Sequence, residues 1–286
     1  MKQFIIAMGL AVLTAGTGMA QTDALLSKKG QPILPEKGDI GLGFNAVPVL
    51  SFFGNMFNGN QNNTFAGNNK FVSNLGNQVL FGKYMLRENR ALRAHLRIGI
   101  NGQTNGNYVF DDVANSPDSL VLDRQRLNNQ TYVLGAGYEF RRGKGRIQGF
   151  YGAEANIALN FGSSSYEYGN AFGAVNPAPT TTTDFANGVS AAQGERLVST
   201  NNGAGFGFGV RPFVGLEYFF APKISVGAEF GWGLNYQVTS DGESKFESFE
   251  AASGNVITRT QVQSGNNGFN VDTDNFNGAL FLMFYF

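Results

Sequence analysis

His95 stands first among the side chains of this sequence that could carry chemistry. A nucleophilic hydrolase needs a histidine base beside a carboxylate, and the chain contains one histidine. His95 lies within residues 92–100, where apolar residues occupy alternate positions. This pattern places it inside a strand, where a hydrogen-bonded core histidine is commoner than a catalytic base. We therefore expect the protein not to be an enzyme.

Metal and cofactor chemistry has little support in the sequence. The aspartates Asp111, Asp112, Asp118 and Asp123 could bind Ca²⁺ in a loop, but their spacing matches no specific calcium site. The chain has no cysteine, so it has no His/Cys cluster for a transition metal. We expect no metal and no cofactor. The formal net charge is zero, and because phosphate binding needs a basic excess, nucleic acid is excluded as a partner.

Alternation of apolar and polar or small residues recurs along the chain and predicts β-strands. In residues 92–100, apolar residues alternate with Arg93, His95, Arg97 and Gly99. We predict strands at 39–46, 77–86, 92–100, 129–140, 147–161, 204–220, 224–238 and 274–286. Pro212 lacks a backbone donor, which predicts a bulge in its strand.

The connections between the predicted strands alternate in length. Three links are a few residues long, whereas 47–74, 102–128, 162–203 and 239–273 are long. Short turns at one end and long loops at the other are typical of an outer-membrane barrel. We predict an all-β fold, an eight-stranded antiparallel transmembrane up-and-down β-barrel with long extracellular loops, of which 162–203 is the most mobile. The polar segment 256–263 also alternates, and we expect it to be one arm of a hairpin that continues the last two strands beyond the membrane. Ten strands are the alternative, if this hairpin enters the wall.

The first twenty residues have the features of a cleaved export signal. Lys2 precedes an apolar run from Phe4 to Leu13, and small residues precede Gln21. The run is shorter than the ~20 residues that a spanning helix needs. We therefore divide the chain into a signal peptide (1–20), a periplasmic N-terminal segment (21–37) and an outer-membrane β-barrel (38–286). Charged residues make up only 15% without a later apolar run of helix length, so strands are the expected way across a membrane.

The inward faces of the predicted strands collect positive and negative charges in matched numbers. The predicted lumen network consists of Lys83, Arg93, His95, Arg97, Glu139, Glu154, Arg211, Glu217 and Glu229. An unpaired buried charge is costly, and an eight-stranded barrel has an interior that side chains can fill. We predict paired charges that plug the lumen. The alternative is a polar conduit lined by the same residues.

Outward-facing aromatic residues fall at two levels that flank an aliphatic band. The predicted belts contain Tyr84, Tyr138 and Tyr218 on the side of the short turns, and Tyr132, Trp232 and Tyr236 on the side of the long loops. Aromatic belts of this kind anchor membrane barrels at the two interfaces.

The C-terminus is an aromatic residue preceded by apolar residues at alternate positions, namely Phe276, Leu280, Leu282, Phe284 and Phe286. This pattern resembles the C-terminal assembly signal of bacterial outer-membrane barrels. In architecture the mature chain resembles the small eight-stranded barrels typified by the OmpA transmembrane domain, OmpX and OmpW. Its Gly/Asn-rich composition and residues 38–54 resemble those of uncharacterised Bacteroidetes-type barrel proteins.

This resemblance implies a location in the cell outer membrane. It implies contact with outer-membrane lipid and lipopolysaccharide, insertion by the barrel assembly machinery, and contacts with other outer-membrane proteins through the extracellular loops. The function it implies is structural or the recognition of a protein partner. A narrow channel or transporter for small solutes or hydrophobic molecules is the alternative.

Overall fold

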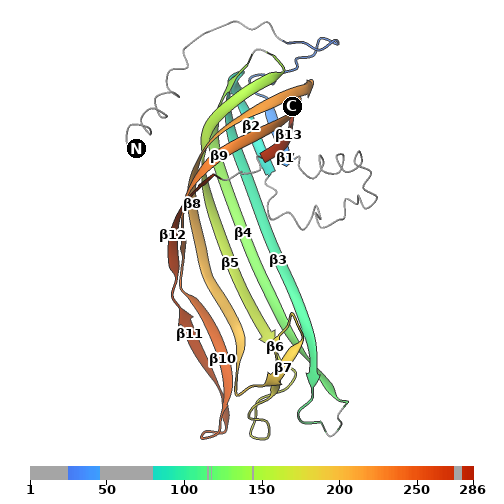
Figure 1. The fold of residues 1–286 in the computed structure, drawn as a ribbon, viewed down its shortest axis with the longest axis vertical. Helices are drawn as coiled ribbons and strands as arrows, with labels where there is room; N and C mark the ends of the chain where they lie inside the picture. The colour runs from blue at the N-terminus through green and yellow to red at the C-terminus, as the bar shows by residue number, and fades with distance from the viewer. Residues whose placement is uncertain (1–24, 46–79, 115, 117, 144, 274–278) are drawn as a thin grey trace.

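The structure is a computed structural model that describes residues 25–45, 80–114, 116, 118–143, 145–273 and 279–286. Within them every regular element is a β-strand, and all strand pairings are antiparallel (Figure 1). The prediction of an all-β antiparallel fold is confirmed. This part of the chain contains no helix of the length and apolar character that a membrane crossing requires. The predicted signal peptide and the whole of the predicted loop 47–74 lie outside the described residues.

Eight strands pair in a closed ring. The order around the ring is β1–β2–β3–β4–β5–β8–β9–β13 and back to β1. The strands are β1 (Ile40–Asn45), β2 (Leu80–Arg87), β3 (Arg90–Phe110), β4 (Leu120–Arg142), β5 (Ile147–Glu167), β8 (Glu195–Ala221), β9 (Ile224–Thr239) and β13 (Ala279–Tyr285). In chain order they correspond to the eight predicted strands.

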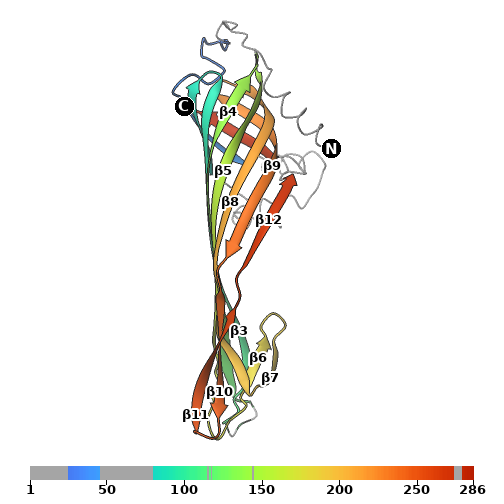
Figure 2. The same ribbon diagram turned by 90° about the vertical axis from the view of Figure 1, so that its left-hand side faces the viewer.

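Four of these strands continue far beyond the ring and form an outer sheet, which extends downward in Figures 1 and 2. We define the outer sheet as residues 101–110, 120–129, 162–167 and 195–203 together with β10 (Gly242–Glu250) and β11 (Asn255–Gln263). A separate hairpin of β6 (Thr180–Asp184) and β7 (Val189–Ala192) lies at its far end, and β12 (Asn266–Thr273) pairs with β9.

The count of eight strands and the predicted loops need correction. The described residues form thirteen strands, eleven of them in one sheet. Most of the predicted loop 102–128 is paired strand, up to Phe110 opposite Leu120. Residues 162–203, predicted as the most mobile loop, contain β6, β7 and the ends of β5 and β8. The segment 256–263 belongs to β11, which forms one arm of a hairpin with β10 as predicted, and it extends the outer sheet rather than the ring. Backbone pairing needs no apolar face, so the strands continue where the apolar alternation stops.

The bulge predicted at Pro212 is absent. Pro212 lies opposite Ala153 in an uninterrupted register with β5. On the other side, the pairing with β9 skips residues 211 and 212 and resumes in the same register at Phe213, opposite Gly231. The local break in pairing accommodates the missing backbone donor without an inserted residue.

Side chains of the ring alternate between an exposed apolar face and a buried face. On β3, Leu96 and Ile98 are 42% and 56% exposed, whereas Arg93 is 5% exposed. Glycines on the inner face make room for aromatic rings: a Cβ atom on Gly215 would overlap the Phe150 ring. The inside of the ring is therefore filled by large side chains that lie over small ones.

The end of the ring near the short turns is closed by the N-terminal segment. Ile33 is 1% exposed and clusters with Met85, Phe219 and Met283. Its carbonyl accepts a hydrogen bond of 2.9 Å from the Lys223 backbone N–H. From residue 25 onward the segment thus contributes to the core of the ring.

Candidate functional site

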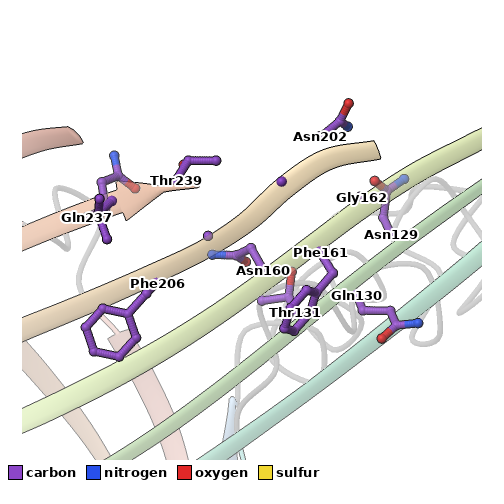
Figure 3. A pocket seen from close by; sticks show the side chains of 13 residues that line it. Asn129, Gln130, Thr131, Asn160, Phe161, Gly162, Asn202, Phe206, Gln237 and Thr239 are labelled. Carbon is purple, nitrogen blue, oxygen red and sulfur yellow. The ribbon is translucent and has the colours of Figure 1, made fainter. Parts of the chain in front are cut away.

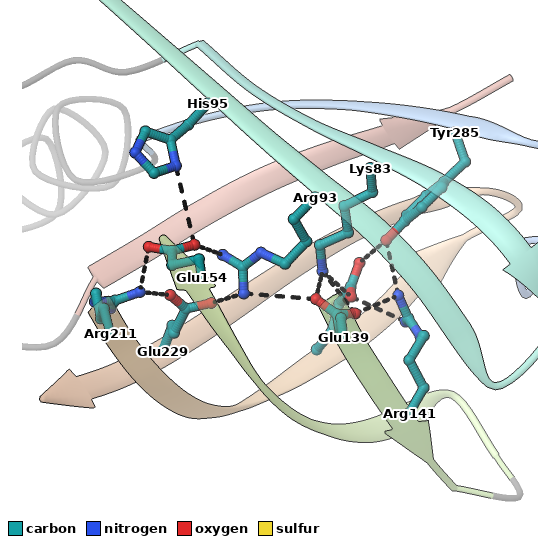
Figure 4. Close-up of polar contacts among 10 residues, drawn as sticks. Lys83, Arg93, His95, Glu139, Arg141, Glu154, Arg211, Glu229 and Tyr285 are labelled. Carbon is teal, nitrogen blue, oxygen red and sulfur yellow. Dashed lines mark hydrogen bonds and ion pairs between the residues drawn. The ribbon is translucent and has the colours of Figure 1, made fainter. Parts of the chain in front are cut away.

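Eight charged side chains meet inside the ring, four cationic and four anionic (Figure 4). They project inward from β2, β3, β4, β5, β8 and β9, and each side chain is at most 11% exposed. We call this set the charge network; it consists of Lys83, Arg93, Glu139, Arg141, Glu154, Arg211, Glu217 and Glu229.

Glu217 lies at the centre of the half of the network nearer the short turns. Its carboxylate is 3.3 Å from Lys83 Nζ and 2.9 Å from Arg141 Nη2. The Tyr285 hydroxyl donates a hydrogen bond of 2.9 Å to Glu217 Oε1, and the Ser225 hydroxyl donates to the same atom. Every polar neighbour of Glu217 is thus a donor, which fits an ionised carboxylate.

Arg93 connects this half to the rest of the network. Its Nη1 atom lies 2.7 Å from Glu229 Oε2 and 3.6 Å from Glu139 Oε2. Arg211 Nη1 lies 2.6 Å from Glu229 Oε1 and 3.1 Å from Glu154 Oε1. Because Glu139 also contacts the lysine and the arginine of the first half, the eight side chains form one connected set without net charge.

Aromatic rings occupy the space between the charges. Arg93 Cζ lies 3.9 Å from the ring centroid of Phe213, and Lys83 Nζ lies 4.6 Å from that of Phe150. A cation above a ring face is attracted by the ring quadrupole, most strongly when water is excluded. The rings therefore stabilise the cations on the sides that no carboxylate covers.

Two residues of the predicted lumen network stay at its margin. His95 Nδ1 is 3.9 Å from Glu154 Oε2, which is too far for a hydrogen bond. Arg97 is half-buried, and its Nε atom has no hydrogen-bond partner among the described residues. Both follow Arg93 at alternate positions of β3, so they lie on the long-loop side of the network.

Arg141 belongs to the charge network, and Ser225 and Tyr285 donate hydrogen bonds to it, although none of the three is among the residues predicted for it. The predicted strand ends at residue 140, which would leave Arg141 in a turn. In the structure β4 continues to Arg142, and the Arg141 side chain is 1% exposed. The alternation that places Glu139 inside would place Arg141 inside as well, had the strand been extended by two residues.

The predicted belt residues, and those assembly-signal residues that the structure describes, lie on the outer side of the ring. Tyr84, Tyr218, Trp232 and Tyr236 are 42–47% exposed, and Tyr132 and Tyr138 are half-buried. Leu280, Leu282 and Phe284 are half-buried, Phe286 is 71% exposed, and Phe276 lies outside the described residues. Phe284 also stacks on Phe44 of the neighbouring strand, with ring centroids 6.1 Å apart.

A recess of about 270 Å³ opens where the ring passes into the outer sheet (Figure 3). Its inner-face lining includes the amides of Asn129, Asn160, Asn202 and Gln237. Amide groups both donate and accept hydrogen bonds, so the recess suits a small neutral polar solute. The charge network lies between this recess and the short turns.

Three of the four aspartates considered as calcium ligands accept hydrogen bonds within the outer part of the protein. Asp123 accepts bonds from Gly169 and Thr182, and Asp111 accepts bonds from the backbone of its own turn. Asp112 accepts bonds from residues that lead into β6. No group of three or more His, Cys, Asp or Glu within the described ranges is arranged to hold a metal ion.

Asp112 makes the attachment of the β6–β7 hairpin sensitive to acid. Burial raises the pKa of the Asp112 carboxyl, but hydrogen bonds from Thr180 and Asn176 outweigh this and hold the pKa below its usual value. A carboxyl with a depressed folded-state pKa stabilises the fold above its unfolded pKa, and this stabilisation is lost as the pH falls through the folded value. We predict that amide exchange at Thr180, corrected for the intrinsic rate, accelerates below about pH 4. Asp112→Asn should abolish this pH dependence; the same dependence in both proteins would contradict the assignment.

The fold and the site together define a class: an all-β protein whose antiparallel strands close in a ring around a buried, charge-compensated interior. No family model matches the chain, and no curated protein matches it. Its function is therefore inferred from the geometry and the charge distribution.

Proposed function

We propose that the protein is an integral outer-membrane β-barrel with a plugged lumen, and that its outer sheet recognises a partner protein. The observation that carries the proposal is the contrast between the two faces of the ring. Leu96, Ile98 and Ile100 are 42–69% exposed, whereas Arg93 on the opposite face of the same strand is 5% exposed. Large exposed apolar surfaces mark membrane or protein contacts, and apolar-out, polar-in alternation is the pattern of outer-membrane barrels.

The eight-stranded ring is proposed as the part within the bilayer. Residues 92–100 of β3 form an apolar-out stretch of nine residues, within the ~9–11 residues that a tilted membrane-spanning strand needs. From Asn101 to Asn107 both faces of β3 carry polar residues or glycine. The change in composition supports an interface with water at this level, and hence an outer sheet outside the membrane.

The plugged lumen follows from the charge network. Four cations and four carboxylates neutralise one another at distances of 2.6–3.6 Å, and aromatic rings fill the space between them. Opening a water path here would separate paired charges, which is costly in a low-dielectric interior. Because a plugged ring would not pass a solute, the outer sheet is the part of the protein proposed to bind a partner.

Protein recognition is assigned to β11, the edge strand of the outer sheet. β11 pairs with β10 from Gly242↔Gln263 to Glu250↔Asn255, and no strand of the described residues pairs with its other edge. All nine residues of β11 are exposed. An open edge of this kind binds an extended segment of another protein through backbone hydrogen bonds. An outer-membrane protein of the same cell is the proposed class of partner.

Site-specific cross-linking tests this assignment, because the chain has no native cysteine. Thr260→Cys places a thiol on β11, and Ser165→Cys places a control thiol on β5, where Arg126 and Ser199 pair on either side. After treatment of intact cells with a short thiol-reactive cross-linker, we expect a defined complex from Thr260→Cys and none from Ser165→Cys. Equal cross-linking from both positions, or from neither, would count against recognition at β11.

A narrow channel is the second candidate. It is favoured by the amide-lined recess between the charge network and the outer sheet. Recordings on the purified protein in planar bilayers distinguish the two functions. A plugged lumen predicts no single-channel steps, whereas regular conductance steps would favour the channel.

A further inference from the structure

We infer that the outer sheet carries a binding cleft for a neutral oligosaccharide, covered by the β6–β7 hairpin. The cleft has a volume of about 570 Å³ and is lined by residues of β3, β4, β5, β6 and β8. This volume falls within the ~300–1,000 Å³ of typical small-molecule sites. The cleft is distinct from the β11 edge, and its ligand belongs to another chemical class than the partner proposed there.

Three aromatic side chains give the cleft an apolar wall. The rings of Tyr166 and Tyr168 are nearly parallel, with an interplanar angle of 7° and centroids 6.2 Å apart, and Phe185 tilts against Tyr166 at 6.0 Å. All three line the cleft and are half-buried. Tyr168 is held in place by the Arg196 guanidinium, 4.4 Å from its ring centroid. The negative faces of aromatic rings attract C–H groups, so this wall suits the C–H face of a sugar ring.

Polar side chains beside this wall, on the same face of the sheet, form a directed hydrogen-bond chain across three strands. Gln103 donates to Asn105 at 2.8 Å, Asn105 donates to Gln125 at 2.9 Å, and Gln125 donates to the Tyr166 hydroxyl at 3.3 Å. Among the described residues, the side-chain carbonyl of Gln103 at one end of the chain has no donor, and the Tyr166 hydroxyl at the other end has no acceptor. Both can therefore bond to a ligand. Thr181 provides a further unpaired group at the border of the cleft. Its buried hydroxyl has no hydrogen-bond partner in the described part of the chain.

Free donors and free acceptors on a rigid polar surface match the hydroxyl groups of a sugar. Each hydroxyl both donates and accepts, so adjacent hydroxyls can meet both ends of such a chain. The amides are already ordered by their mutual bonds, which lowers the entropy cost of binding. The aromatic wall and the polar chain lie side by side, so together they offer a pyranose ring both a C–H contact and partners for its hydroxyl groups.

The charges around the cleft favour a neutral ligand. Glu195 forms two bonds of 2.9 Å with Arg259, and Arg196 lies 2.7 Å from Glu247. Asp184 accepts hydrogen bonds from its own turn. The one arginine that lines the cleft is thus paired with a carboxylate, so the lining does not supply the basic excess that a phosphate or sulfate ligand requires.

A glycan microarray tests the inference on the full-length protein in detergent. The array carries neutral oligosaccharides, anionic oligosaccharides, peptides and polysaccharide isolated from lipopolysaccharide, so that free glycans are distinguished from the sugar of the membrane itself. We expect binding to neutral sugars. Tyr166→Ala should weaken it about tenfold by removing the ring that contacts both other rings of the aromatic wall. Tyr108→Ala is the matched control, because Tyr108 is 66% exposed and lies on the other face of the same sheet.

A second variant distinguishes recognition from folding. Tyr166→Phe keeps the ring and removes only the hydroxyl, so it should bind more weakly than wild type and more tightly than Tyr166→Ala, with an unchanged circular dichroism spectrum. Absence of binding to every neutral sugar, preference for anionic sugars or peptides, or equal loss in Tyr166→Ala and Tyr108→Ala would overturn the inference. None of these results affects cross-linking at Thr260, so the two proposals fail separately.

Discussion

Glu217→Ala is expected to lower the free energy of unfolding by about 3–5 kcal/mol, the usual cost of removing one partner of a buried ion pair. Lys83 and Arg141, whose side chains are 0% and 1% exposed, would then share the single remaining carboxylate of Glu139. The Tyr285 hydroxyl would also lose its acceptor. Equilibrium urea unfolding of the protein in lipid vesicles measures the change as a lower transition midpoint.

Two further variants show whether the loss comes from the network. Glu217→Gln keeps the shape of the side chain and removes its charge, and should still lower the midpoint clearly. Glu243→Gln removes a glutamate that is 48% exposed and pairs with the exposed Lys245 on the outer sheet, so its midpoint should match the wild type. Equal midpoints for the two glutamine variants would mean that the buried charges do not stabilise the ring.

Asp123→Ala is expected to release the β6–β7 hairpin from the outer sheet. The Asp123 carboxylate is fully buried and accepts bonds of 2.7 and 2.9 Å from Thr182 and 2.8 Å from the Gly169 N–H. Hydrogen bonds to a charged group contribute about 1.5–3 kcal/mol each, and their loss leaves buried donors unpaired. We expect the local free energy of opening to fall by about 3 kcal/mol, which corresponds to amide exchange about 100-fold faster.

Hydrogen-exchange mass spectrometry of peptides covering residues 178–192 measures this opening. Asp184→Asn is the matched control, because Asp184 belongs to the same hairpin but, among the described residues, bonds only to Ala186 and Asn187 of its own turn. Exchange across β6 should stay slow in that variant. Unchanged exchange in Asp123→Ala would show that other contacts attach the hairpin.

The ring strands could be predicted because their two faces meet different surroundings. Leu96 and Ile98 point outward and Arg97 points inward, so apolar and polar residue types alternate along the strand. The same alternation identified the inward-facing charges. It could not give their partners: Arg93 and Glu229 are 136 residues apart and meet across the ring, which depends on the closure of the sheet.

Apart from the alternating segment 256–263, the outer sheet left no comparable signal. Residues such as Gln103, Thr104 and Asn105 are polar on both faces, so neither period nor hydrophobicity distinguishes them from a loop. Asn, Ser and Gly are also the residues that favour turns. What holds these segments in strands is long-range pairing, as between Asn105 and Gln125, and the cleft beneath the β6–β7 hairpin is likewise formed by residues from distant parts of the chain.

Spin-label scanning of residues 96–100 tests the proposed barrel most directly, because single cysteines can be introduced into a chain that has none. With the protein in lipid vesicles, we predict high collision rates with lipid-soluble oxygen at positions 96, 98 and 100 and low rates at 97 and 99. A water-soluble nickel chelate should reach positions 96 and 98 poorly. Uniform accessibility along the strand, or ready access of the chelate to positions 96 and 98, would contradict a ring whose apolar face contacts lipid.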